Sequence, residues 1–161
     1  MAVDMFLDLG KDVKGESKDK VYEGKIDLLA WSWGISNTGS FHTGSGGGSG
    51  KANFQDISIT KYIDAASPTL MLYCSNGKHF ADAKLIIRKA GDKPLEYLIL
   101  NFHEVLVCAY STGGSGGEDR LTENISLNFA KVQVDYWTQA KDGSKGDPYN
   151  YGWNISGNAP L

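Results

Sequence analysis

The sequence predicts a mainly β fold, a compact β-barrel of two packed antiparallel sheets with about eight strands and one short helix. Three observations predict it. Apolar and polar residues alternate along most of the chain, only one segment carries helix signals, and glycine gathers in loops between the alternating segments. With 161 residues, of which 41% are hydrophobic and 22% charged, we expect residues 1–161 to form a single domain with its own core.

The second alternating segment, 26–35, is expected to be one long strand. Its odd positions from 29 to 35 are large and apolar, whereas Ala30, Ser32 and Gly34 are small. Because successive side chains of a strand point to opposite faces, these three would form a smooth, small-residue surface. The full set of expected strands is 3–9, 26–35, 54–62, 85–89, 97–110, 122–136 and 151–155.

The segment 122–136 alternates with a change of phase. Its apolar positions are odd up to Phe129 and even from Val132 onward. A one-residue slip of this kind predicts a β-bulge near Ala130 and Lys131, which would bend the strand.

The helix signals place Ser67 as the N-cap and Pro68 at the first helical position. Asn76-Gly77 supplies the left-handed stop. The apolar stripe between these signals consists of Leu70, Met71, Tyr73 and Cys74.

Two glycine-rich segments, 38–51 and 112–118, are expected to be flexible loops. The first resembles a phosphate-binding loop, but Ser45 and Ala52 occupy positions where that motif needs glycine and a hydroxyl. The second contains the G-x-S-x-G pattern of a hydrolase nucleophile around Ser115, yet no helix signal follows it. We therefore expect no catalytic residues and no cofactor.

Charge and composition exclude further classes. The net charge of −3 argues against nucleic-acid binding, and no apolar run is long enough for membrane insertion. The acidic residues Asp4 and Asp8 stand where a signal peptide would be basic and apolar, so we expect cytoplasmic folding without a cleaved signal. Cys74 and Cys108 are expected to be free thiols, and the three dispersed histidines predict no metal site.

Trp31 and Trp33 leave one alternative open. Two aromatic residues spaced by two on a strand belong to the core more often than to a binding site. They could nevertheless stack on a small ligand, so the alternative function is a ligand-binding β-barrel module.

Several segments are similar, in order and with matching spacing, to the haemolysin-coregulated protein (Hcp) family. They include LAWSWG at 29–34 and STGGSGGEDRLTEN at 111–124. The other matching segments are 1–6, 13–19, 59–64, 75–79 and 151–155.

The resemblance implies a structural protein rather than an enzyme. Hcp proteins form hexameric rings that stack into the inner tube of the type VI secretion system, and the tube carries and chaperones effectors in its lumen. The implied partners are other copies of the chain, effectors, the sheath and the spike tip. The implied route is cytoplasmic assembly followed by secretion.

On this basis, Ala30, Ser32 and Gly34 are the candidate lumen-lining residues. The loop that the resemblance assigns to contacts between rings contains Gly44, Gly46, Gly47, Gly48, Gly50 and Lys51.

Overall fold

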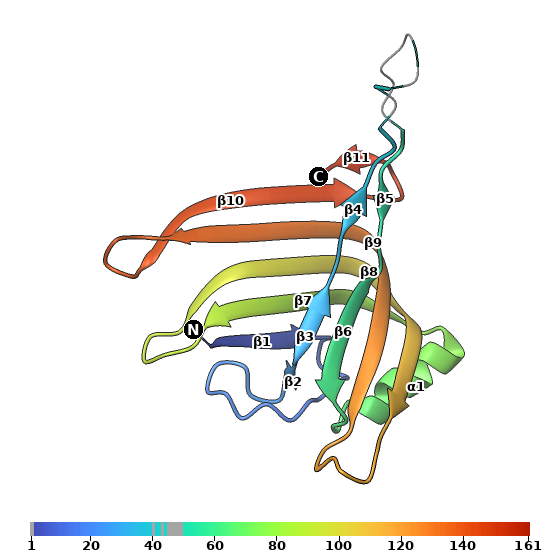
Figure 1. Cartoon of the computed structure of the whole chain (residues 1–161), viewed down its shortest axis with the longest axis vertical. Coiled ribbons are helices and arrows are strands. Elements are labelled where there is room, and N and C mark those ends of the chain that lie inside the picture. The colour runs from blue at the N-terminus through green and yellow to red at the C-terminus, as the bar shows by residue number, and fades with distance from the viewer. Residues whose placement is uncertain (1, 40, 43, 45–49) are drawn as a thin grey trace.

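The computed structural model describes residues 2–39, 41–42, 44 and 50–161. Within these residues the chain forms eleven strands and one helix (Figure 1). The elements are β1 Val3–Asp8, β2 Ile26–Asp27, β3 Ala30–Ser32, β4 Ile35–Ser36, β5 Asn53–Phe54, β6 Ile57–Tyr62, α1 Ser67–Asn76, β7 His79–Lys89, β8 Leu95–Gly113, β9 Thr122–Gln139, β10 Lys145–Asn154 and β11 Ala159–Pro160.

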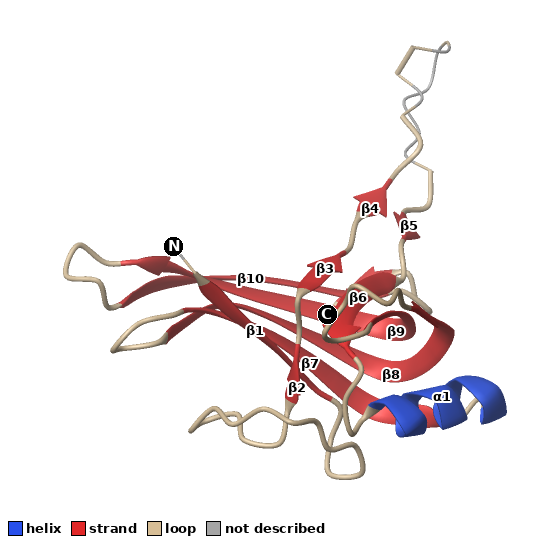
Figure 2. Cartoon of the chain, turned by 60° about the horizontal axis from the view of Figure 1, so that its bottom comes forward, coloured by secondary structure: helices blue, strands red, loops and turns tan. Residues whose placement is uncertain are grey.

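Two antiparallel sheets make up the fold, which confirms the predicted mainly β class with one short helix. The larger sheet has the order β11-β10-β9-β8-β7-β1-β2, with β6 attached to β9 and β3 attached to β6. The smaller sheet is the β4–β5 pair. The larger sheet curls on itself rather than closing into a ring of paired strands, and α1 packs at one end near β8 (Figures 1 and 2).

The single strand expected over 26–35 is divided into β2, β3 and β4, because this segment changes partners twice. β2 pairs with β1, β3 pairs with β6, and β4 pairs with β5. Between the first two, the Leu28 N–H donates to Met5 O at 3.0 Å and the Leu29 N–H donates to Thr60 O at 2.8 Å. The segment therefore bridges the two edges of the curled sheet before it leaves the body.

The bulge expected at Ala130 and Lys131 is wrong in position. β9 keeps one register with β8 through this point, and the register shift lies between Val107 and Ala109 of β8. Glu104, which lies across from Ala130, has a left-handed φ of 55°. β8 therefore changes phase together with β9, so the pair bends without either strand gaining an unmatched residue there.

The helix α1 begins one residue earlier than its sequence signals suggest. Its N-cap is Ala66 rather than Ser67, and Pro68 lies in the first turn. Gly77 ends the helix as predicted, with φ of 71° and its N–H donating to Tyr73 O at 3.0 Å. No Cβ is present to oppose this left-handed conformation.

One hydrophobic core lies between α1 and the inner faces of β1, β6, β7, β8 and β9. From the helix it receives Leu70 and Tyr73, whose ring lies 4.7 Å from that of Phe80. Met71, expected in the apolar stripe, is 39% exposed instead. None of the helices among the described residues is long and apolar enough to cross a membrane.

Candidate functional site

A surface of short, uncharged side chains crosses four neighbouring strands, β3, β6, β9 and β8. Ala30 and Ser32 lie on it, while Trp31 between them packs against the core. The strand registers set the other members opposite one another. We call this surface the small polar face, and its residues are Ala30, Ser32, Ser58, Thr60, Ala109, Ser111, Asn124 and Ser126.

Sequence reasoning found only part of the small polar face. Ser58 and Thr60 alternate with buried Ile57 and Ile59, which was a usable signal for an outward surface. Which strands lie beside β3 follows only from the register. The Thr60 hydroxyl donates to Asn124 Oδ1 at 2.7 Å, which links β6 and β9 on this face.

Gly34, the third candidate lumen residue, lies beyond β3 and outside this face. Its carbonyl oxygen accepts from the Gln55 N–H at 3.0 Å. A Cβ on Gly34 would lie 3.1 Å from Gln55 Oε1, so the glycine permits a close approach of two chain segments. Gly34 begins a two-stranded projection that we call the stem, residues 34–38 and 50–55.

The stem projects away from the body of the chain (Figures 1 and 2). Ile35 is 46% exposed and Phe41 is 88% exposed. Of the candidate inter-ring residues, Gly44, Gly50 and Lys51 are described, and a Cβ on Gly50 would lie 3.3 Å from the Thr38 side chain on the facing segment of the stem. The others, Gly46, Gly47 and Gly48, lie outside the described residues.

A buried charged group, which we call the Lys61 cluster, lies at the end of β6 behind the small polar face. The Lys61 side chain is fully buried, and its ammonium contacts Glu123 and donates to Asp64 Oδ1 at 2.8 Å. The Ser67 hydroxyl donates to Glu123 Oε1 at 2.8 Å, and the Tyr110 hydroxyl donates to Oε2. The cluster therefore joins β6, β8, β9 and the start of α1.

The Lys61 cluster is structural in its chemistry. Burial, together with the bond to Glu123, raises the pKa of Tyr110, so its hydroxyl stays protonated and donates. Each charged partner is satisfied inside the protein, as buried charges require. The sequence held one signal, because Lys61 stands in phase with the inward-facing Ile57 and Ile59.

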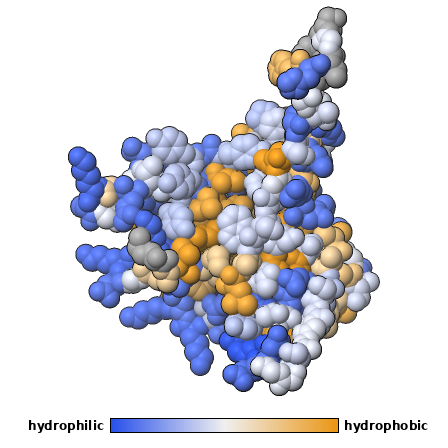
Figure 3. Space-filling model, viewed as in Figure 1, coloured by the Kyte–Doolittle hydropathy of each residue, from blue (hydrophilic) through white to orange (hydrophobic). Residues whose placement is uncertain are grey.

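Another exposed surface extends from the core along the long strands. The register places Met5, Ile87, Leu98, Tyr136 and Tyr149 side by side across β1, β7, β8, β9 and β10. We call these five residues the wing row. Ile87 is buried, but Tyr136 is 43% exposed and Tyr149 is 61% exposed, so the row leaves the core for the surface. Figure 3 shows apolar side chains exposed over the long strands in one view.

Comparison with known proteins identifies the family. The sequence matches the family described as "Type VI secretion system effector, Hcp" over residues 6–136. It is 64% identical over 160 residues to Protein hcp1 of Pseudomonas aeruginosa, covering 98% of each chain. The chain belongs to the Hcp family.

Solved structures agree with this assignment. A type six secretion system protein is 32% identical, with a TM-score of 0.92 over 99% of this chain and 100% of that one. Hcp1 from Salmonella typhimurium is 36% identical, with a TM-score of 0.82 over the whole of both chains. The chain is thus an Hcp protein of the type VI secretion system.

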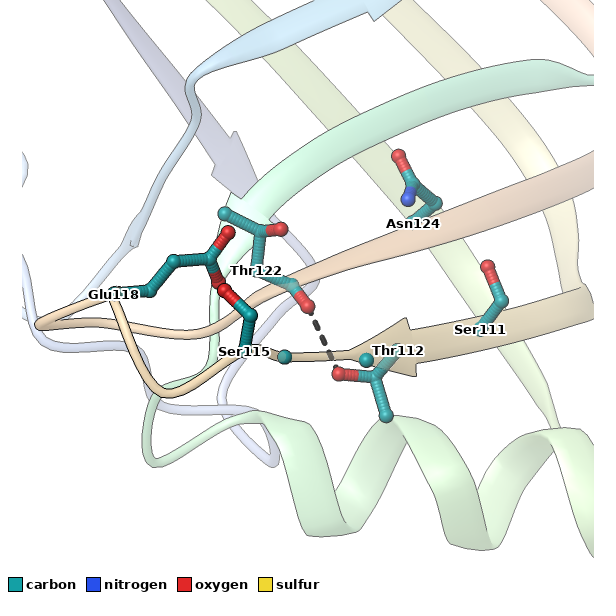
Figure 4. A pocket seen from close by; sticks show the side chains of 8 residues that line it. Ser111, Thr112, Ser115, Glu118, Thr122 and Asn124 are labelled. Carbon is teal, nitrogen blue, oxygen red and sulfur yellow. Dashed lines mark hydrogen bonds between the residues drawn. The ribbon is translucent and has the colours of Figure 1, made fainter.

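Ser115, the serine of the hydrolase-like motif, lies in the loop after β8 in this Hcp chain. It lines an open pocket of about 330 Å³ with Ser111, Thr112, Glu118 and other polar residues (Figure 4). No hydrogen bond among the described residues joins its hydroxyl to a histidine, the base that most often activates a serine nucleophile.

The tryptophan pair does not form an open stacking platform. The Trp33 ring lies 6.5 Å from that of Phe54 and 6.3 Å from that of Phe129. Its Nε1–H donates to Gln55 O at 2.9 Å. Phe54 and Phe129 thus pack against the ring of Trp33, where a ligand would have to stack. Trp31 packs against the core.

The cysteines are free thiols, as predicted. Burial and a contact with Asp56 raise the pKa of the Cys108 thiol to about 11. A thiol in that state is a poor nucleophile at neutral pH. The described part of the chain holds no cluster of three or more metal-ligating side chains.

Proposed function

We propose that this Hcp chain is the structural subunit of the type VI secretion tube. Six copies form a ring, rings stack into the tube, and the lumen carries and chaperones effectors. The chain is not an enzyme in this proposal, and it binds neither nucleic acid nor the membrane interior. The observation that carries the proposal is the wing row, an apolar series that continues past the core onto exposed tyrosines.

The wing row supports self-association because its exposed end is aromatic. Tyr136 and Tyr149 directly oppose each other across β9 and β10. Tyrosine is enriched where protein interfaces bury their anchors. Among the described residues, the β10 segment 145–151 pairs only with β9, so its outer edge also has free backbone groups.

A ring is formed by a heterologous contact, in which one side of each copy meets a different side of the next. The wing row supplies one such side. Stacking of rings is a separate contact, to which the proposal assigns the stem and its loop, including Gly44, Gly50 and Lys51.

The small polar face is the proposed lining of the lumen. Ala30 and Ser32 add little bulk, and Ser58 and Thr60 beside them carry hydroxyls but no charge. A surface of this kind keeps a channel wide and gives many weak hydrogen bonds to a passing protein. Gly34 would stand at its rim, where the stem begins.

The remaining partners in this proposal are the sheath around the tube and the spike at its tip. Assembly takes place in the cytoplasm, and the protein then leaves the cell with the tube. The ligand-binding alternative has no support from Trp33, because Phe54 and Phe129 already pack against its ring.

Size-exclusion chromatography with light scattering tests ring formation. Six copies of a 17.5 kDa chain give a species of about 105 kDa. Tyr149→Arg should convert it to smaller species, because a charge would be buried in the contact. The matched control is Val21→Arg, at another exposed apolar residue away from the wing row. A wild-type monomer at micromolar concentration, or an intact ring in Tyr149→Arg, contradicts the proposal.

Effector retention tests the lumen assignment. Ser32→Gln should leave the ring intact and reduce the amount of effector that co-purifies with it, because glutamine adds bulk where the effector would lie. Ser32→Ala is the control, since it changes little volume. Equal retention by both variants would remove Ser32 from the effector surface while leaving the ring proposal standing.

A further inference from the structure

Five aromatic rings form a continuous series from the centre of the core to the stem. Phe102 is fully buried, and its ring lies 4.5 Å from that of Phe129. The ring centroids of Phe129 and Trp33 lie 6.3 Å apart, and those of Trp33 and Phe54 lie 6.5 Å apart. The Phe54 centroid in turn lies 6.5 Å from that of Trp153 in β10. We call these five residues the aromatic series.

Trp33 and Phe54 stand where the stem meets the body. Trp33 is the last residue before the stem begins, and Phe54 belongs to β5, the returning strand. Their rings are stacked at an angle of 27°. The Trp33 Nε1–H also donates to Gln55 O, so the outgoing segment is bonded to the returning one. Trp33 is thus fixed on one side by the core and on the other by the stem.

Beyond this point the described part of the stem adds no further side chain to the core, although Asn37 and residues 50–52 border a surface pocket with Trp153 and Asn158. Of its residues, only Phe54 packs against the core cluster. Ile35, directly opposite Phe54, is 46% exposed. The β4–β5 ladder joins two residues on each side, and so short a ribbon is marginal by itself.

We propose that Trp33 and Phe54 are positioning residues that set the direction of the stem relative to the body. In this role they hold the described stem at a fixed angle to the neighbouring ring, which rests on the proposed function. A stem held in one direction loses less conformational freedom when the next ring docks, so stacking becomes more favourable. Ring closure depends on other surfaces and does not need this anchoring.

The test compares Trp33→Leu and Phe54→Leu with the control Trp31→Leu. Trp31 lies two residues before Trp33 and packs against the same core, but it makes no ring contact with the stem. Phe54→Tyr, which keeps an aromatic ring, is the conservative variant. Each protein is assayed as the assembled ring for mass, thermal stability, hydrogen exchange of the stem peptides and stacking seen by electron microscopy.

We expect hydrogen exchange in the described stem to rise about tenfold in Trp33→Leu and Phe54→Leu, through loss of the ring contact and, for Trp33, its hydrogen bond. Stacked rings should become several-fold rarer, with ring mass unchanged and thermal stability no lower than in Trp31→Leu. Phe54→Tyr should restore both exchange and stacking.

Two results would overturn the inference. Stem exchange equal to that of the control would show that the aromatic series does not anchor the stem. Faster stem exchange with undiminished stacking would show that the direction of the stem does not matter to the next ring. Failure of the wild-type chain to form rings is a different outcome, because it refutes the proposed function and, with it, the role in stacking, while stem exchange still tests the anchoring.

Discussion

Replacing Lys61 by methionine is expected to destabilise this chain far more than the same replacement at Lys25. Both lysines form ion pairs, but Lys61 is fully buried with Glu123, whereas Lys25 and Asp8 are 32% and 30% exposed. Methionine fills much of the space of a lysine. The comparison therefore isolates the consequence of removing the charge.

The magnitude follows from what Lys61 leaves behind. Without its ammonium, the fully buried Glu123 keeps only the hydroxyl donors of Ser67 and Tyr110, and the nearly buried Asp64 keeps the Ala66 N–H. Breaking a buried ion pair from one side costs about 3–5 kcal/mol. That is roughly a hundredfold to several-thousandfold in the folding equilibrium. For the exposed pair Lys25–Asp8, the expected cost is about 0–1 kcal/mol.

Urea unfolding followed by tryptophan fluorescence measures both variants at matched protein concentration, since self-association shifts apparent stability. The slope against urea should stay constant while the midpoint falls. Adding Glu123→Gln to Lys61→Met should recover part of the loss, because one stranded charge is removed. If Lys61→Met costs no more than Lys25→Met, the buried pair does not hold β6 and β9 as described.

Three further outcomes are expected. The hydrogen bond that the His103 ring donates to Asp82 raises the pKa of His103 above its usual 6.5. The contact therefore stabilises the fold at low pH, and its contribution fades as pH rises through the folded-state pKa. NMR titration should give a lower midpoint for His103 in Asp82→Asn. Leu70→Ala should cost about 2–5 kcal/mol in chemical unfolding, whereas Leu72→Ala, at a 56% exposed position, should cost less than about 1 kcal/mol. Alkylation of Cys108 at pH 8 should be slow and accelerate toward its pKa of about 11, as mass spectrometry can follow.

The strands that keep the same partner strands along their whole length were predictable from the sequence. In β6 the apolar Ile57 and Ile59 are buried, as their alternation indicates. The segment 26–35 alternates equally well, yet it is three strands. Alternation reports which face a side chain takes, but it does not report which strand lies alongside. The partners of this segment change from β1 to β6 to β5, and no local pattern records that.

The candidate surfaces were predictable in the same partial way. Ala30 and Ser32 could be placed on a small-residue face from their own strand, but Asn124 and Ser126 join them only through the register of β6 with β9. The buried position of Lys61 was harder to predict from the sequence, because a lysine in phase with buried residues usually marks the end of a strand. Its partner Glu123 lies sixty-two residues away, and only the fold brings the two together.

The pairing of β9 has a mechanical consequence. Along its length this strand is bonded to β8 on one side, and on the other first to β6 and then to β10. Antiparallel hydrogen bonds lie across the strands, so a pull along β9 loads many of them at once in shear rather than one at a time. A subunit built around such a strand is therefore stiff when it is stretched along β9. A sideways pull on the outer edge of β10 would instead break its hydrogen bonds one after another.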